Sequence, residues 1–258
     1  MATKENEKIL SLDRYLELKE QGFEFEGQSY LFWEYMRILT ELRKHNPDIK
    51  FLLENVKMKK EWERVLTEAI GVPGVHINSA LVSAQNRKRI YWTNIDSIEQ
   101  PEDRGLLLRD VLQSEVDEKY FLKEEVVKNM IAHRDRCKAK GYGFGAIFHK
   151  GEQKMAALKI GGRGVDDLVE VNKHLAKNLT STDEKAQCFL ATSWKGAWVN
   201  GMTLIEQEPR IRRLTPTECA RLQTIPEWYK WQCSETQQYK MLGNGWTVEV
   251  IKHIFSHL

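Results

Sequence analysis

The chain has 258 residues, of which 41% are apolar, and this is enough to build a substantial hydrophobic core and excludes a disordered tail. Lys and Arg number 39 against 37 Asp and Glu, so the net charge of +2 gives no general case for nucleic-acid binding, which must rest on local patches. The four cysteines lack metal-ligand spacing and no run of 18 apolar residues occurs, which predicts a soluble, cytoplasmic protein with reduced thiols.

The first hundred residues are predicted to contain helices and strands in the order α-β-α-β-β. Apolar spacing and helix-ending residues predict a helix from Leu31 to Leu42, a strand at 51–56, a helix at 59–70, and strands at 75–82 and 90–95. A helix followed by a short strand buried on both sides is typical of a parallel α/β sheet.

The rest of the chain divides into a loose region and a regular one. From Pro101 to about residue 205 the apolar runs are short, and glycines and charges of both signs are frequent. Thr215 and Pro216 then predict the start of a helix over TECARLQTI, and a last helix at 248–258 follows the LGNGWT turn. We therefore expect domains at 1–98 and 99–205, and a return to the first domain at 206–258.

An acid ends the first predicted strand, in the segment FLLENV. Glu54 lies where α/β sheets place their ligands, and burial there would raise its pKa toward use as a proton donor. The alternative is that Glu54 only caps the following turn or pairs with a lysine of the KMKK segment that follows.

Two arginines alternate before the last predicted strand of this region, in SAQNRKRIYW. Arg87 and Arg89 are expected to point to the same side, where two guanidinium groups could hold a phosphate or a carboxylate. The alternative is a solvated edge strand. For LGNGWT, the alternative to a functional role is a helix-initiating turn whose glycines adopt positive φ.

Five blocks occur in one order along the chain: SYLFWEYMRIL, FLLENV, SAQNRKRIYW, RRLTPTECARLQTIP and QQYKMLGNGWTV. In this order they resemble the DNA cytosine-5 methyltransferases, especially those of bacteria and their phages. The resemblance covers residues 27–96 and 206–258, and residues 99–205 match the variable target-recognition region by position only. It implies an α/β fold with an incomplete Rossmann-like sheet that uses S-adenosylmethionine, plus a small irregular target-recognition domain.

The resemblance also implies roles for individual residues. Glu54 would protonate ring N3 of a flipped cytosine, while Arg89 would fix the base and Arg87 would lie near the same pocket, with Asn55 and Gln85 as further substrate contacts. The S-adenosylmethionine pocket is expected to include Leu31, Glu34, Asn244 and Trp246. Four residues of the RRLTPTECARLQTIP block are expected to be mainly scaffolding: Arg212, Arg213, Glu218 and Arg221.

Contacts to double-stranded DNA are expected in the region 101–205, where cations lie among glycines and aromatic residues. The candidates are Arg134, Arg136, Lys138 and Lys140 beside GYGFG, and Lys159 and Arg163 near GGRG. Because Glu and Asp are interspersed, a solvated charged loop is the alternative.

Two blocks of the family are not found in these 258 residues: a glycine-rich F-x-G-x-G turn and a Pro-Cys dipeptide whose thiolate attacks the cytosine. The four cysteines follow Arg136, Gln187, Glu218 and Gln232 instead. We therefore expect the C-terminal portion of a methyltransferase that needs a complementing chain, or else a truncated gene product. A catalytically inactive DNA-binding or regulatory protein is the alternative.

Overall fold

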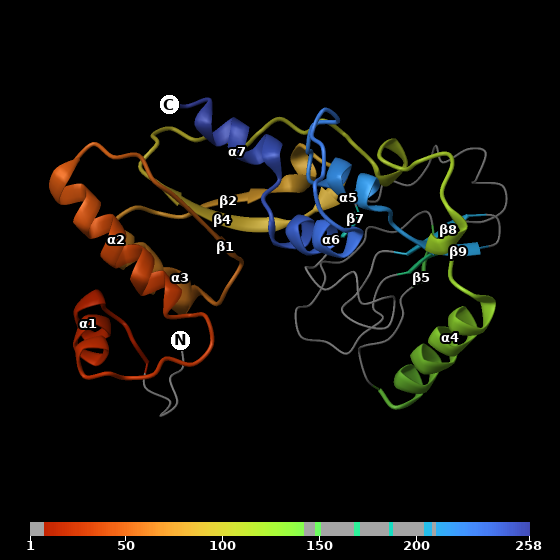
Figure 1. The fold of residues 1–258 in the computed structure, drawn as a ribbon, viewed down its shortest axis with the longest axis horizontal. Coiled ribbons are helices and arrows are strands. Elements are labelled where there is room, and N and C mark those ends of the chain that lie inside the picture. The colour runs from red at the N-terminus through yellow and green to blue at the C-terminus, as the bar shows by residue number, and fades with distance from the viewer. Residues whose placement is uncertain (1–7, 142–147, 151–167, 171–185, 188–203, 208–209) are drawn as a thin grey trace. The chain divides into compact units, whose positions relative to one another are not determined.

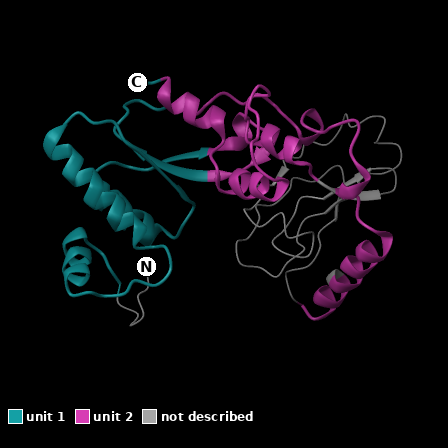
Figure 2. Ribbon diagram, viewed as in Figure 1, with its two compact units in different colours: residues 1–77, 89–98, 257–258 teal, residues 78–88, 99–256 magenta. Residues whose placement is uncertain are grey.

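The computed structural model describes residues 8–141, 148–150, 168–170, 186–187, 204–207 and 210–258 (Figure 1). The chain forms two compact units (Figure 2). Unit 1 comprises residues 1–77, 89–98 and 257–258, and unit 2 comprises residues 78–88 and 99–256. The predicted division at 99 and 206 stays a prediction, since residues on both sides of 206 pack within unit 2.

Unit 1 combines helices with a three-stranded sheet in the order β1-β4-β2. Its elements are α1 (Leu12–Glu20), α2 (Leu31–His45), β1 (Leu52–Val56), α3 (Lys60–Ile70), β2 (Val75–Asn78) and β4 (Lys88–Thr93). Strands β1 and β4 are antiparallel, with Glu54 opposite Tyr91, so the expected parallel arrangement is wrong for this pair.

The helices of unit 1 begin and end at recognisable signals. Ser11 caps α1 by accepting a hydrogen bond from the backbone N–H of Arg14, and α3 ends at Gly71, whose φ of 86° is left-handed. The apolar faces of these helices meet the sheet in one core: Ile9, Tyr15, Leu18, Phe32, Trp33, Met36, Leu39, Phe51, Leu66, Ile70, Ile90 and Trp92.

Unit 2 contains more helix than strand where it is described. Its elements are η1 (Ser79–Leu81), β3 (Gln85–Asn86), η2 (Leu108–Asp110), η3 (Glu118–Tyr120), α4 (Glu124–Ala139), β5 (Phe148–Lys150), β6 (Leu168–Glu170), β7 (Ala186–Gln187), β8 (Leu204–Gln207), β9 (Arg210–Arg213), α5 (Pro216–Leu222), α6 (Glu235–Asn244) and α7 (Val248–Phe255). Strands β3 and β7 pair in parallel, and a second sheet has the order β5-β6-β8-β9. The core of unit 2 consists of Ala84, Leu108, Val111, Leu214, Cys219, Ala220, Leu222, Tyr239 and Leu242.

Several predicted bounds differ from the observed ones. The predicted strand at 75–82 ends at Asn78 and continues as a 3₁₀ turn, and the last helix ends at Phe255. Helices α1, α4 and α6 were not predicted. In the described part of the chain no helix has the length and apolar character needed to cross a membrane.

Candidate functional site

Glu54 and Arg89 lie together on one face of the sheet in unit 1. In the β1–β4 register Glu54 is opposite Tyr91, so these two residues share a face of the sheet. Arg89 lies two residues from Tyr91 on β4 and therefore points to the same face as Glu54. The Nε atom of Arg89 lies 2.6 Å from Oε1 of Glu54, and these side chains are only 14% and 15% exposed. The close approach of Nε to Oε1 holds the carboxyl group of Glu54 against the guanidinium, largely shielded from solvent.

Leu31 and Asn55 line a cavity of about 470 Å³ in unit 1. The other lining residues are mostly apolar: Gln28, Ser29, Phe32, Tyr35, Leu53, Met58, Trp62 and Leu66. Asn55 follows Glu54 on β1 and therefore points to the opposite face, where its Oδ1 accepts a hydrogen bond from the N–H of Val56 at 2.8 Å. Since Leu31 is half exposed, the cavity wall is open to a ligand at this point.

Glu34, although predicted beside Leu31, is not among the residues that line this cavity. Its carboxylate accepts hydrogen bonds from the hydroxyl of Tyr15 at 2.5 Å, from Lys19 and from Arg37 at 2.8 Å. The bonds from Lys19, Tyr15 and Arg37 lower the pKa of Glu34 from its ordinary 4.5 to about 2. In the structure Glu34 therefore joins α1 to α2.

Asn244 and Trp246 lie in unit 2, at the turn between α6 and α7, and both are exposed. Trp246 lines a shallow apolar cavity with residues of α7, among them Ile251 and Phe255. In the alternative given for LGNGWT the glycines of this turn adopt positive φ, but Gly245 has a φ of −74°. Gly245 is needed because a Cβ there would lie 2.9 Å from the carbonyl oxygen of Met241.

Arg87 and Gln85 are buried in unit 2, at 5% and 0% exposure. The guanidinium of Arg87 donates to the carbonyl oxygens of Gly243 at 3.4 Å and Gly245 at 3.0 Å. Gln85 donates to the carbonyl of Leu222 at 3.3 Å. The structure thus gives the two arginines of this motif different partners.

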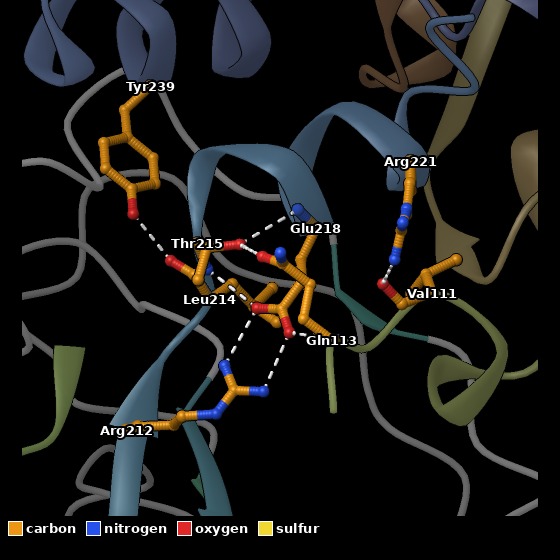
Figure 3. Close-up of polar contacts among 8 residues, drawn as sticks. All are labelled: Val111, Gln113, Arg212, Leu214, Thr215, Glu218, Arg221 and Tyr239. Carbon is orange, nitrogen blue, oxygen red and sulfur yellow. Dashed lines mark hydrogen bonds and ion pairs between the residues drawn. The ribbon is translucent and has the colours of Figure 1, made fainter. Parts of the chain in front are cut away.

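The RRLTPTECARLQTIP block forms a buried polar network around Glu218 (Figure 3). Arg212 donates two hydrogen bonds of 2.8 Å to the carboxylate, and the pair is 1% and 0% exposed. The carboxylate also accepts from the backbone N–H groups of Gln113 and Thr215, each at 2.8 Å. Every lone-pair direction of Glu218 thus has a donor, as a buried charge requires.

Other members of this block pack around the same network. Arg221 donates to the carbonyl of Val111 at 3.3 Å, and the hydroxyl of Tyr239 donates to the carbonyl of Leu214 at 2.6 Å (Figure 3). The contacts of Arg212, Glu218 and Arg221 are therefore those of a scaffold, whereas the side chain of Arg213 lies outside the described part.

Few of the expected DNA contacts fall in the described part of the chain. Arg136, Lys138 and Lys140 are exposed at the end of α4. Lys159, Arg163 and the side chain of Arg134 lie outside the described residues.

Of the three cysteines in the described residues, two are buried and one is partly exposed. Cys219 is 1% exposed, and burial raises the pKa of its thiol well above the ordinary value. Cys137 is also buried, in the last turn of α4, and Cys233 is partly exposed. Cys188 lies outside the described residues.

Comparison with known proteins decides the family. The family model of the C-5 cytosine-specific DNA methylases matches residues 77–258, more than half of the chain. The chain belongs to this family. The resemblance found in the five sequence blocks is thereby confirmed.

The family members most similar to this chain include bacterial Type II methyltransferases. M.HpaII of Haemophilus parainfluenzae is 28% identical over 260 residues, which is 91% of this chain and 65% of that protein. M1.ScrFI of Lactococcus lactis subsp. cremoris is 27% identical over 92% of this chain and 57% of its own length. The chain thus spans about three fifths of these two relatives.

Solved structures confirm an α/β methyltransferase fold. The S. pombe Dnmt2 methyltransferase superposes with a TM-score of 0.51 at 18% identity, over 80% of this chain and 65% of that one. The Entamoeba histolytica methyltransferase EhMeth superposes with a TM-score of 0.51 at 14% identity, over 98% of this chain and 82% of that one. At such identities the likeness concerns the fold, and the roles of individual residues stay predictions.

Sequence reasoning assigned no role to several residues that hold these elements together. Gln223 is fully buried and uses its side-chain amide as both donor and acceptor, and Gln113 binds both Thr215 and Glu218. The sequence offers a weak signal for Gln223, because Gln223 and Thr224 form a polar pair flanked by Leu222 and Ile225. Gln113 carries no such signal.

Proposed function

We propose that this chain takes part in transferring a methyl group from S-adenosylmethionine to carbon 5 of a flipped cytosine in double-stranded DNA, in the cytoplasm of a bacterium. The observation that carries the proposal is the Glu54–Arg89 pair, because a shielded carboxylate and a guanidinium suit the Watson–Crick edge of an extruded cytosine. We assign the contacts to the cofactor to two places. One is Leu31 with the cavity it lines, and the other is the turn that carries Asn244 and Trp246.

In the proposed reaction a thiolate adds to carbon 6 of the base while Glu54 delivers a proton to ring N3. When bound, S-adenosylmethionine would supply the methyl group for carbon 5 and leave as S-adenosylhomocysteine. A base removes the proton from carbon 5, the thiolate leaves carbon 6, and N3 returns its proton. Arg89 would keep the carboxyl group of Glu54 in place throughout.

The nucleophilic thiolate is assigned to a segment outside these 258 residues, on the same polypeptide or on a complementing chain. No cysteine of the sequence follows a proline, and the thiol of Cys219 is buried and held neutral. Without a thiolate the acid has no covalent adduct to protonate.

The test combines this chain with a polypeptide that carries the family's P-C-Q-G-F-S segment and F-x-G-x-G turn. Transfer of labelled methyl groups to DNA is measured, and we expect Glu54→Gln to lower the rate by about 10²- to 10⁴-fold with little change in DNA affinity. The matched control is Glu61→Gln, which removes an exposed carboxylate and should leave the rate of methyl transfer unchanged.

A stable complex without methyl transfer would overturn the proposal and favour a non-catalytic DNA-binding protein. Full activity of Glu54→Gln would also overturn it, because the carboxyl group would then have no part in the reaction.

A further inference from the structure

The turn from Leu242 to Thr247 in unit 2 is held by its backbone carbonyls, which point inward. Gln223 donates to the carbonyl of Leu242 at 2.6 Å and to that of Gly245 at 3.4 Å. The backbone N–H of Gly245 donates to the carbonyl of Met241 at 2.7 Å. The carbonyls of Leu242 and Gly245 therefore accept from a buried donor, while the side chains of Asn244 and Trp246 stay exposed.

Arg87 supplies the charged donors of this arrangement. One guanidinium spans the carbonyl oxygens of Gly243 and Gly245, at 3.4 and 3.0 Å. The two nitrogens that make these bonds have a fixed separation, so they set the relative position of the two carbonyls, which a single ammonium cannot do. Arg87 is 5% exposed, and its guanidinium is therefore directed at the protein backbone rather than at solvent.

Gln223 and Thr224 hold the far side of the same turn. The hydroxyl of Thr247 donates to Oε1 of Gln223 at 2.9 Å, and the N–H of Val248 donates to the carbonyl of Gln223 at 3.0 Å. The N–H of Glu249 donates to the hydroxyl of Thr224 at 2.9 Å. These bonds satisfy the first N–H groups of α7, which would otherwise lack acceptors.

We propose that Arg87, together with Gln223, is a positioning residue that fixes the 242–247 turn so that Asn244 and Trp246 face the methyl donor. This inference rests on the proposed function and assigns Arg87 to the cofactor side of the reaction, not to the cytosine. It joins three sequence blocks, SAQNRKR, RLQT and LGNGWT, into one hydrogen-bonded unit.

The first experiment measures the turn itself, in the chain as it exists. Hydrogen exchange of the backbone amides of residues 243–249 is compared in the wild type, Arg87→Met and Arg87→Lys. We expect faster exchange in Arg87→Met and an intermediate rate in Arg87→Lys, which retains one donor site. Arg64→Met, which removes an exposed arginine from α3, is the matched control and should leave these amides unchanged.

The second experiment measures KM for S-adenosylmethionine and for DNA in the complemented enzyme. Arg87→Met should raise KM for S-adenosylmethionine by about tenfold or more, as expected for losing hydrogen bonds from a charged donor, and leave KM for DNA within about twofold. When Asn244→Ala and Trp246→Ala are already present, Arg87→Met should add little, because it acts through those side chains. A loss of folding alone would not separate the two KM values in this way.

A rise in KM for DNA alone, or an effect of Arg87→Met that is fully additive with Asn244→Ala and Trp246→Ala, would overturn the inference. Unchanged amide exchange in Arg87→Met would overturn it as well. If exchange rises but the wild-type complex transfers no methyl group, the proposed function fails, and with it the cofactor role of Arg87, whereas the hydrogen-bonded turn stands.

Discussion

At the scale of single residues, the Arg212–Glu218 pair is the most deeply buried ion pair among the described residues, and all its polar atoms have partners. Removing one member leaves the other charge buried and uncompensated. We expect Glu218→Gln and Arg212→Met each to lower the free energy of unfolding by about 3–5 kcal/mol, measured by urea denaturation.

The double variant Arg212→Met/Glu218→Gln should recover much of that loss, because it leaves no unpaired charge and keeps a side-chain acceptor beside the backbone N–H groups of Gln113 and Thr215. Glu68→Gln, which breaks an exposed pair with Arg64, is the control and should change stability by less than about 1 kcal/mol. Single variants as stable as this control would show that the pair does not stabilise the fold.

Glu34 predicts a pH dependence of stability. Its pKa in the folded chain, about 2, lies below the ordinary 4.5, so its stabilisation is complete above about pH 4.5 and is lost as the pH falls toward 2. Between about pH 5 and pH 3 the free energy of unfolding should therefore fall more steeply for the wild type than for Glu34→Gln. Equal slopes in denaturation experiments would contradict this, and Glu61→Gln serves as the exposed carboxylate control.

The two arginines of the QNRKR motif show what sequence can and cannot predict at this scale. Spacing and family likeness led us to expect Glu54 and Arg89 in one pocket, and the structure pairs them. For Arg87 the same reasoning placed it beside Arg89. Arg87 donates to backbone carbonyls some 156 residues further along the chain. Because every residue has a backbone carbonyl, such a partner cannot be identified from the sequence.

At the scale of elements, strong apolar periodicity predicted α2 and α3 well, while α1, α4 and α6 were missed. All three missed helices are rich in charged or polar residues, and α1 and α6 bury only two side chains each, so their periodic signal is weak. The direction of β1 relative to β4 was also mistaken, because a buried strand has the same composition in parallel and antiparallel pairs.

Gly74 allows a test of how tightly β2 approaches β4. A Cβ at this position would lie 2.6 Å from Cγ2 of Ile90 and 3.0 Å from Cε2 of Trp92, both in fully buried side chains. We expect Gly74→Ala to lower the free energy of unfolding by about 1–3 kcal/mol through overpacking. In an Ile90→Ala background the same substitution should cost less, and purely additive losses in denaturation would count against this packing.

At the scale of the whole molecule, the net charge of +2 gives no attraction to DNA by itself, so binding must depend on local cations. Arg136, Lys138 and Lys140 are exposed together at the end of α4. If they contact phosphates, the logarithm of DNA affinity should fall with the logarithm of salt concentration, and each cation removed should reduce that slope by about 0.9. Lys44→Ala, on the surface of α2, is the control, and a slope unaffected by all three substitutions would exclude these contacts.

The network around Glu218 also bears on how proteins of this family could be recombined. Gln113 and Arg212 both donate to this one carboxylate, so the segment between residues 113 and 212 begins and ends beside Glu218. Because closing a longer loop at a fixed point costs little additional entropy, the residues between 113 and 212 can differ in length and sequence while the scaffold is unchanged. A graft that exchanges this stretch should therefore keep Gln113, Arg212 and Glu218 together as its junction.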